Sequence, residues 1–103
     1  MINNQLINNV VRKIVNNFHP ERIILFGSYA NDTHKEDSDL DLIVIWNTDL
    51  NVHKRKLLLS KLFPMRNFSL DIFAYTEKEE QKFKNIPGTI LYEAIHNGKI
   101  IYG

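Results

Sequence analysis

Residues 23–46 constrain the fold of this chain more than any other stretch. They contain a short apolar run, a Gly27-Ser28 pair, a polar loop, and a second apolar run that opens with Asp39 and Asp41. Successive side chains of a strand point to opposite faces of a sheet, so the two aspartates would share one face. Neighbouring carboxylates repel each other, and a hard divalent cation such as magnesium removes that penalty by binding their oxygens. The stretch therefore predicts two strands with a cation site between them.

The second apolar run is expected to be a strand with two different faces. One face carries Leu40, Leu42, Val44 and Trp46, and the other carries Asp39, Asp41, Ile43 and Ile45. Between the strands, Gly27 and Ser28 are expected to open a short helical turn over residues 28–30, followed by a polar loop over residues 31–38. Only the first end of the second strand has the composition of a functional site.

The rest of the chain alternates between helical and strand patterns. Apolar residues recur every four positions over residues 2–18, which predicts an amphipathic helix. Pro20 is expected to end this helix and to hold the preceding residue, His19, in an extended conformation. The later elements expected are a helix over residues 50–62 with its cap in the turn 47–49, a strand over 69–75, a helix from the Thr76/Glu79 capping box to about Lys84, a helix over 89–96 and an extended segment over 99–102. This order predicts an α/β (α+β) fold, with helices over a small sheet.

Size and composition narrow the class of protein. A chain of 103 residues is expected to form one domain over residues 1–103. The 13 Lys and Arg residues nearly balance the 12 Asp and Glu residues, so net charge does not indicate direct nucleic-acid or membrane binding. The absence of cysteine excludes disulfides, thiolate catalysis and cysteine zinc sites. Without a signal-peptide pattern or an apolar run near the ~20 residues of a membrane span, the expected location is cytoplasmic.

A third carboxylate, Asp71, falls near the start of the third predicted strand. Two metal ions can stabilise the attacking and leaving oxygens of an in-line displacement, and Asp39 and Asp41 could bridge both ions. Asp71 could complete one ion and accept the proton of the attacking hydroxyl. Gly27-Ser28 suits phosphate, because glycine lets a ligand approach backbone N–H groups and the serine hydroxyl adds a donor. Together these residues predict metal-dependent phosphoryl or nucleotidyl transfer.

Each feature also has a simpler explanation when taken alone. An Asp-x-Asp at a strand end is most often solvated, and a Gly-Ser pair after a strand is most often a turn. Asp71 could be a charge that protects an edge strand from aggregation. Their combination at the ends of strands favours a functional site.

The combination resembles a known family. Gly27-Ser28, followed after ten residues by Asp39-Leu40-Asp41, resembles the signature of nucleotidyltransferases related to DNA polymerase beta. The surroundings that are also similar are Ser38-Asp39-Leu40-Asp41-Leu42 and Leu70-Asp71-Ile72. In length the chain is most similar to the minimal nucleotidyltransferase (MNT) subgroup of that superfamily. The resemblance implies a polymerase beta-like fold, with a small mixed β-sheet flanked by helices.

The resemblance also implies site residues, a cofactor and a partner. Asp39, Asp41 and Asp71 would be the catalytic metal ligands, and Gly27 and Ser28 would bind the phosphates of ATP. The cofactor would be Mg²⁺, as two ions. Members of the MNT subgroup are antitoxins paired with HEPN-domain RNase toxins, which implies transfer of AMP to a tyrosine hydroxyl of the toxin. A bulky anion near the toxin's catalytic residues would block RNA binding.

Two alternatives stay open. The protein could neutralise its partner by binding alone, with the carboxylates as a vestige. It could also add nucleotides to the end of a tRNA or another RNA.

Asn31 and Asp32 depart from the family pattern, because many members have Arg and then Gly after the Gly-Ser-x-Ala segment. The loss of a cation and the gain of an anion near the phosphates predict weaker nucleotide binding. Aspartate adopts the left-handed backbone conformation at modest cost, so the fold is expected to tolerate Asp32. Lys35 is a candidate for the missing positive charge.

Other conspicuous residues are expected to be structural. The four histidines show no metal-ligand spacing. The basic residues 54–56 are expected on the solvated face of a helix, with contact to RNA or an acidic partner as the alternative. Trp46 and Phe73 are expected in the core, and Tyr29 is expected to pack against the fold.

Overall fold

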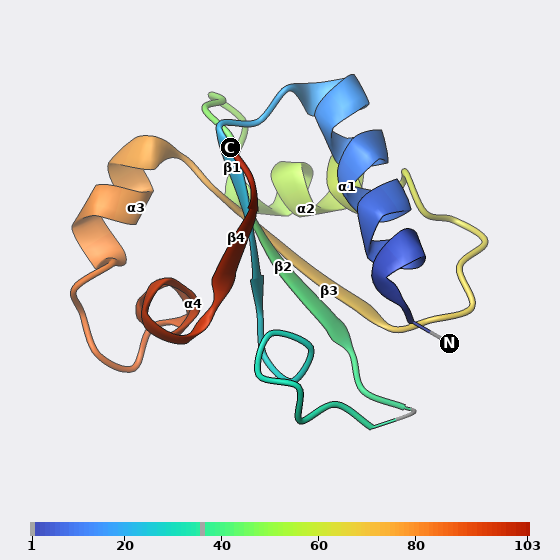
Figure 1. Ribbon diagram of the computed structural model, residues 1–103. Coiled ribbons are helices and arrows are strands. Elements are labelled where there is room, and N and C mark those ends of the chain that lie inside the picture. Colours follow the sequence, from blue (N-terminus) through green and yellow to red (C-terminus); the bar gives the residue numbers. More distant parts are fainter. Residues whose placement is uncertain (1, 36) are drawn as a thin grey trace.

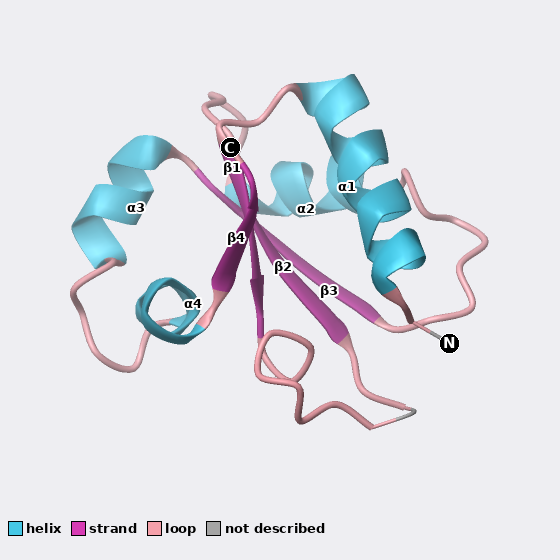
Figure 2. Cartoon of the chain, in the orientation of Figure 1, coloured by secondary structure: helices cyan, strands magenta, loops and turns pink. Residues whose placement is uncertain are grey.

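The computed structural model describes residues 2–35 and 37–103. Figure 1 follows the chain through these residues, and Figure 2 colours helices and strands separately. The elements in chain order are α1 (Asn4–Phe18), β1 (Arg22–Phe26), β2 (Leu40–Ile45), α2 (Val52–Ser60), β3 (Leu70–Tyr75), α3 (Glu77–Phe83), α4 (Ile90–Asn97) and β4 (Lys99–Tyr102). Each strand and each long helix that the sequence predicts is present, with ends shifted by a few residues. In the described part of the chain, no helix has the length and apolar character needed to cross a membrane.

The strands form one mixed sheet in the order β3-β2-β1-β4. β1 runs antiparallel to both β2 and β4, whereas β2 runs parallel to β3. β3 and β4 are therefore the edge strands of this sheet (Figure 2). The α/β fold with a small mixed sheet flanked by helices is confirmed.

Helices cover both faces of the sheet (Figure 1). α1 and α2 pack on one face, where the buried side chains include Ile14 of α1, Leu59 of α2 and Leu42 of β2. α3 and α4 pack on the other face, where Leu91 of α4 covers Ile43 and neighbouring residues. The predicted alternation along β2 is confirmed, because Leu40, Leu42 and Val44 belong to the first core and Ile43 and Ile45 to the second.

α1 begins and ends with side-chain and backbone caps. The side chain of Asn3 accepts a hydrogen bond from the Leu6 N–H at 2.9 Å, which satisfies one free amide of the first turn. At the other end His19 adopts a left-handed conformation, with φ 50° and ψ 56°, and its N–H donates to the Val15 carbonyl. The expected extended conformation of His19 is therefore wrong, because this residue closes the helix before Pro20 begins the next segment.

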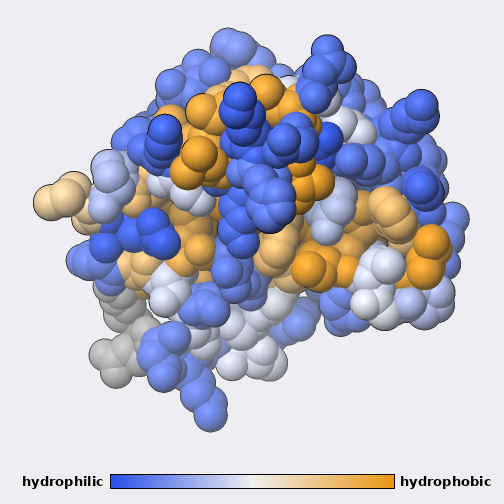
Figure 3. Space-filling view, turned by 180° about the vertical axis from the view of Figure 1, so that it is seen from behind, coloured by the Kyte–Doolittle hydropathy of each residue, from blue (hydrophilic) through white to orange (hydrophobic). Residues whose placement is uncertain are grey.

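α2 differs most from the prediction. Its N-cap is Asn51, whose side chain accepts from the Lys54 N–H at 2.9 Å, so the cap does not lie in the turn 47–49. Leu57, an apolar residue of this helix, is 53% exposed. The space-filling view from behind shows several apolar areas at the surface, separated by hydrophilic side chains (Figure 3).

Arg55 is buried rather than solvated, at 6% exposure. Its Nη1 donates to Oε1 of Glu79 at 2.7 Å, and its Nε donates to the Leu50 carbonyl at 2.7 Å. Glu79 also accepts from the Thr76 N–H at 2.8 Å, while Thr76 Oγ1 accepts from the Glu79 N–H at 3.1 Å. The predicted capping box is confirmed, and Arg55 joins it to α2. The sequence prediction for Arg55 is wrong, because a charged side chain can be buried when a carboxylate and carbonyls pair with it.

Candidate functional site

The sheet brings the three aspartates of the sequence motif together. Asp41 on β2 lies opposite Phe26 in the antiparallel pair with β1. It also lies opposite Asp71 in the parallel pair with β3. Residues that face each other in neighbouring strands point to the same side of a sheet, so Phe26, Asp41 and Asp71 form one row. Asp39 lies two residues before Asp41, on the loop that enters β2.

Carboxylate oxygens of Asp39, Asp41 and Asp71 all lie within 4.8 Å of one another. Asp39 and Asp71 are exposed, while Asp41 is half-buried. Burial, together with the negative charges of Asp71 and Asp39, raises the pKa of Asp41 to about 6. Three oxygen ligands converging on one point, with like charges that destabilise each other, fit a hard divalent cation.

Gly27 makes room for this cluster. It has φ 76°, a conformation that favours glycine. A Cβ atom at this position would collide with Oδ2 of Asp41 and would lie 3.1 Å from its Cγ. Glycine is therefore required for the turn after β1 to approach the carboxylate of β2 this closely.

The segment after Gly27 is a hydrogen-bonded turn rather than the helical turn that the sequence predicts. The Ala30 N–H donates to the Gly27 carbonyl at 3.1 Å, and the Thr33 N–H donates to the Ser28 carbonyl at 3.0 Å. The N–H groups of Ser28 and Tyr29 donate to no backbone carbonyl of the described residues. A turn with free amides beside a carboxylate cluster has donors for a phosphate and ligands for its metal ion.

Comparisons with known proteins agree with this arrangement. Residues 8–103 match the family described as Polymerase beta, Nucleotidyltransferase. The chain belongs to this nucleotidyltransferase family. A Methanocaldococcus jannaschii protein named "Putative protein adenylyltransferase MJ0604" is 30% identical over 82 residues, which cover 80% of this chain and 78% of the relative.

Solved structures share the fold of this nucleotidyltransferase. A nucleotidyltransferase from Sulfolobus solfataricus, named as putative, has a TM-score of 0.66 at 20% identity, over 93% of this chain and 76% of its own. A toxin–antitoxin structure with AMP-PNP has a TM-score of 0.61 at 24% identity, over 92% of this chain and 72% of its own. A mutant of the toxin–antitoxin MntA–HpeT has a TM-score of 0.64 at 22% identity, over 100% of this chain and 74% of its own.

The loop between β1 and β2 departs from the family pattern without distorting the fold. Asp32 has φ 56°, so it occupies the left-handed conformation expected for it. Tyr29 is buried and stacks on His34, with ring centroids 4.2 Å apart, which confirms its packing role. Lys35 is exposed, and its N–H donates to Ser38 Oγ at 2.7 Å. Its role as the missing positive charge stays a prediction.

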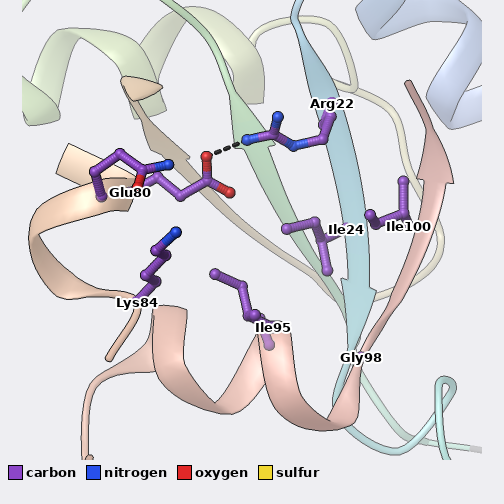
Figure 4. A pocket seen from close by; sticks show the side chains of 9 residues that line it. Arg22, Ile24, Glu80, Lys84, Ile95, Gly98 and Ile100 are labelled. Atoms are coloured by element: carbon purple, nitrogen blue, oxygen red, sulfur yellow. Dashed lines mark hydrogen bonds and ion pairs between the residues drawn. The ribbon is translucent and has the colours of Figure 1, made fainter. Parts of the chain in front are cut away.

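A cavity of about 370 Å³ lies elsewhere on the nucleotidyltransferase, between α3, α4 and the strands β1 and β4. Figure 4 shows the Arg22–Glu80 ion pair in its wall, with Ile24, Ile95 and Ile100 beside it. None of the three aspartates lines this cavity. Asp39 and Asp71 of the carboxylate cluster are instead exposed to solvent.

The contact between Phe73, on the strand of Asp71, and Lys56 of α2 is not predicted from the sequence. Phe73 is two residues after Asp71 on β3 and is half-buried, so it is only partly a core residue. The Nζ of Lys56 lies 5.1 Å from the centroid of the Phe73 ring. No local pattern connects α2 with this strand, and the only signal in the sequence is the period of two that places Phe73 on the same face as Asp71.

Proposed function

We propose that this nucleotidyltransferase transfers AMP from ATP to a tyrosine hydroxyl of a partner protein, a HEPN-domain RNase toxin, and acts as its antitoxin. The observation that carries the proposal is the cluster of Asp39, Asp41 and Asp71, with oxygens within 4.8 Å of one another beside the Gly27 turn. The relative named as a protein adenylyltransferase supports AMP transfer to protein. The fold shared with toxin–antitoxin structures, one of them with AMP-PNP, supports the partner and the nucleotide.

The three aspartates would hold Mg²⁺, as one or two ions. When bound, Mg²⁺ neutralises the charge of the phosphates and the pyrophosphate that leaves. Asp41 of β2 lies against the Gly27 turn and Asp39 lies on the loop that enters β2, so these two carboxylates would hold the metal ion nearest the phosphates. Gly27 and Ser28 would bind the phosphates through backbone N–H groups and the serine hydroxyl.

The reaction makes one bond and breaks one. The tyrosine oxygen forms a bond to the α-phosphorus of ATP, and the bond between that phosphorus and the bridging oxygen breaks with its electron pair on pyrophosphate. The hydroxyl proton passes to a carboxylate oxygen of Asp71, which is exposed and on an edge strand. The modified tyrosine carries a negatively charged phosphodiester, which would repel the RNA that the toxin cleaves.

The test is the intact mass of the partner that copurifies with the tagged protein. Incubation with ATP and MgCl₂ should add the mass of AMP to the partner, and the addition should disappear with Asp41→Asn. Asp49→Asn, at an exposed aspartate outside the cluster, is the matched control.

Two results would contradict the proposal. Neutralisation of the toxin by the double variant Asp39→Asn, Asp41→Asn without any change of mass would mean inhibition by binding alone. Label from α-³²P-ATP that appears in RNA and not in protein would mean addition to an RNA end.

A further inference from the structure

The geometry of in-line transfer determines from which edge of the sheet the acceptor approaches. The attacking and leaving oxygens lie on opposite sides of the phosphorus in such a displacement. With pyrophosphate leaving against the Gly27 turn at the end of β1, the attacking oxygen comes from the side of Asp71 on β3. β3 is an edge strand, and no other strand of the described chain lies beyond it. An acceptor on a second protein can therefore approach over this edge.

An aromatic surface lies on the side from which the acceptor enters. Phe73 shares a face with Asp71 and follows it by two residues, a separation of about 6.6 Å along a strand. Its ring centroid lies 6.2 Å from that of Phe26, with a tilt of 48° between the rings. Both rings are half-buried, so each has an exposed part. The surface therefore extends from Phe26 on β1 to Phe73 on the edge strand β3.

A positive charge sits at the outer end of this surface. The Nζ of Lys56 lies 5.1 Å from the Phe73 centroid, while the residue as a whole is exposed. Its neighbour Arg55 is held by Glu79 and by backbone carbonyls, which fixes this turn of α2 against β3. Lys56 is thus presented to the open edge by a helix that is anchored to the strand of Asp71.

We propose that Phe73 and Lys56 form the acceptor-binding site and select an aromatic hydroxyl. The proposal rests on the proposed function, since it names the residues that receive the tyrosine. A phenol ring that packs against Phe73 reaches along β3 with its hydroxyl towards Asp71, and offset or edge-to-face contact stabilises the pair. The ammonium of Lys56, which lies 5.1 Å from the centroid of the Phe73 ring, is placed to contact the face of the bound phenol ring through a cation–π interaction.

The test compares two variants with two matched controls. Phe73→Leu removes the ring but keeps an apolar side chain, and Phe83→Leu makes the same change at another half-buried phenylalanine of this core. Lys56→Gln removes the ammonium, and Lys54→Gln makes the same change one residue before Arg55, at another exposed lysine. Each protein is assayed for AMP addition to the copurifying partner over a range of partner concentrations at saturating ATP. Calorimetry with Mn²⁺ and AMP-PNP gives the nucleotide affinity independently of transfer.

We expect the KM for the partner to rise roughly tenfold in Phe73→Leu and several-fold in Lys56→Gln, while the AMP-PNP Kd stays within about twofold of wild type. Both controls should keep the wild-type KM. A weaker AMP-PNP affinity with an unchanged partner KM would mean that the ring holds the nucleobase, and it would overturn the proposal. Unchanged values of both constants would also overturn it.

The wild-type protein separates this proposal from the function on which it rests. No transfer of AMP by wild type would refute the proposed function and the acceptor site with it. Transfer by wild type with variants that behave like their controls would refute the acceptor site alone.

Discussion

Two charged clusters at opposite ends of β3 differ in almost every physical respect. Asp39, Asp41 and Asp71 place like charges together, and burial with mutual repulsion raises the pKa of Asp41 to about 6. At the other end, Arg55 and Glu79 form a pair of opposite charge. Burial alone would raise the pKa of Glu79, but hydrogen bonds from Arg55 and Thr76 lower it below its usual value.

The difference separates function from stability. The paired cluster is self-sufficient, because each charge has its partner within the fold. The aspartate cluster is unfavourable until a cation binds, so the fold alone does not explain it. A protein can carry such a cost at a site where a ligand offsets it.

Asp41→Asn should produce the largest effect, a loss of at least about 10³-fold in the rate of AMP transfer. The amide removes a central ligand, and Mn²⁺ affinity measured by calorimetry should fall with it. Stability measured by urea unfolding without metal should be equal to or greater than that of wild type, because one repelling charge is gone. A marked loss of stability would instead indicate that Asp41 is a structural residue.

Arg55→Met should be the most destabilising single change in the paired cluster. It leaves the Glu79 carboxylate without its buried partner, and we expect the free energy of unfolding to fall by about 2–4 kcal/mol. Urea denaturation measures this, with Lys54→Met on the exposed neighbour as the control. A similar small effect of both substitutions would show that the pair contributes little.

The stability of the metal-free protein should depend on the ionisation of Asp41. Its folded pKa of about 6 is above the unfolded value near ~3.9, so the folded state holds the proton more tightly. Unfolding free energy should therefore fall by about 1–2 kcal/mol as the pH rises from 4 through 6, after allowance for partial exposure. Urea unfolding in EDTA between pH 4.5 and 7.5 tests this. The same slope in Asp41→Asn would assign the change to other groups.

Thr76→Ala should have the smallest effect. It removes the hydroxyl that accepts the Glu79 N–H at the start of α3, and loss of such a cap costs about 1 kcal/mol. Thermal unfolding should show a lower Tm, while the rate of AMP transfer by the folded protein stays unchanged. A loss of transfer without a change in Tm would mean that the capping box influences the active site.

Period-two alternation was sufficient to predict the strands and their faces. It predicts a shared face for Asp39 and Asp41, and the pairing of β2 with β3 places Asp71 directly opposite Asp41. The amphipathic helix α1 and the capping box at Thr76 can also be predicted from the sequence, because both depend on residues that are close along the chain. The resemblance to polymerase beta-like nucleotidyltransferases added the expectation of a mixed sheet.

The errors concern positions that depend on distant contacts. Arg55 lies between two lysines, so the sequence suggested a solvated face, whereas its partner Glu79 is 24 residues away. Phe73 and Lys56 come from different elements, and their proximity appears only once α2 packs beside β3. The local sequence after Gly27 is compatible with a helical turn and with a non-helical one. The close approach of this turn to the Asp41 side chain, which depends on a distant part of the chain, favours the non-helical conformation.

The most direct test is a crystal structure with Mn²⁺ and AMP-PNP, using anomalous scattering to locate manganese. We expect manganese bound by Asp39, Asp41 and Asp71, with the phosphates against Gly27 and Ser28. Nucleotide bound elsewhere, for example in the cavity beside Arg22 and Glu80, with no manganese at the three aspartates, would refute the assignment of the active site.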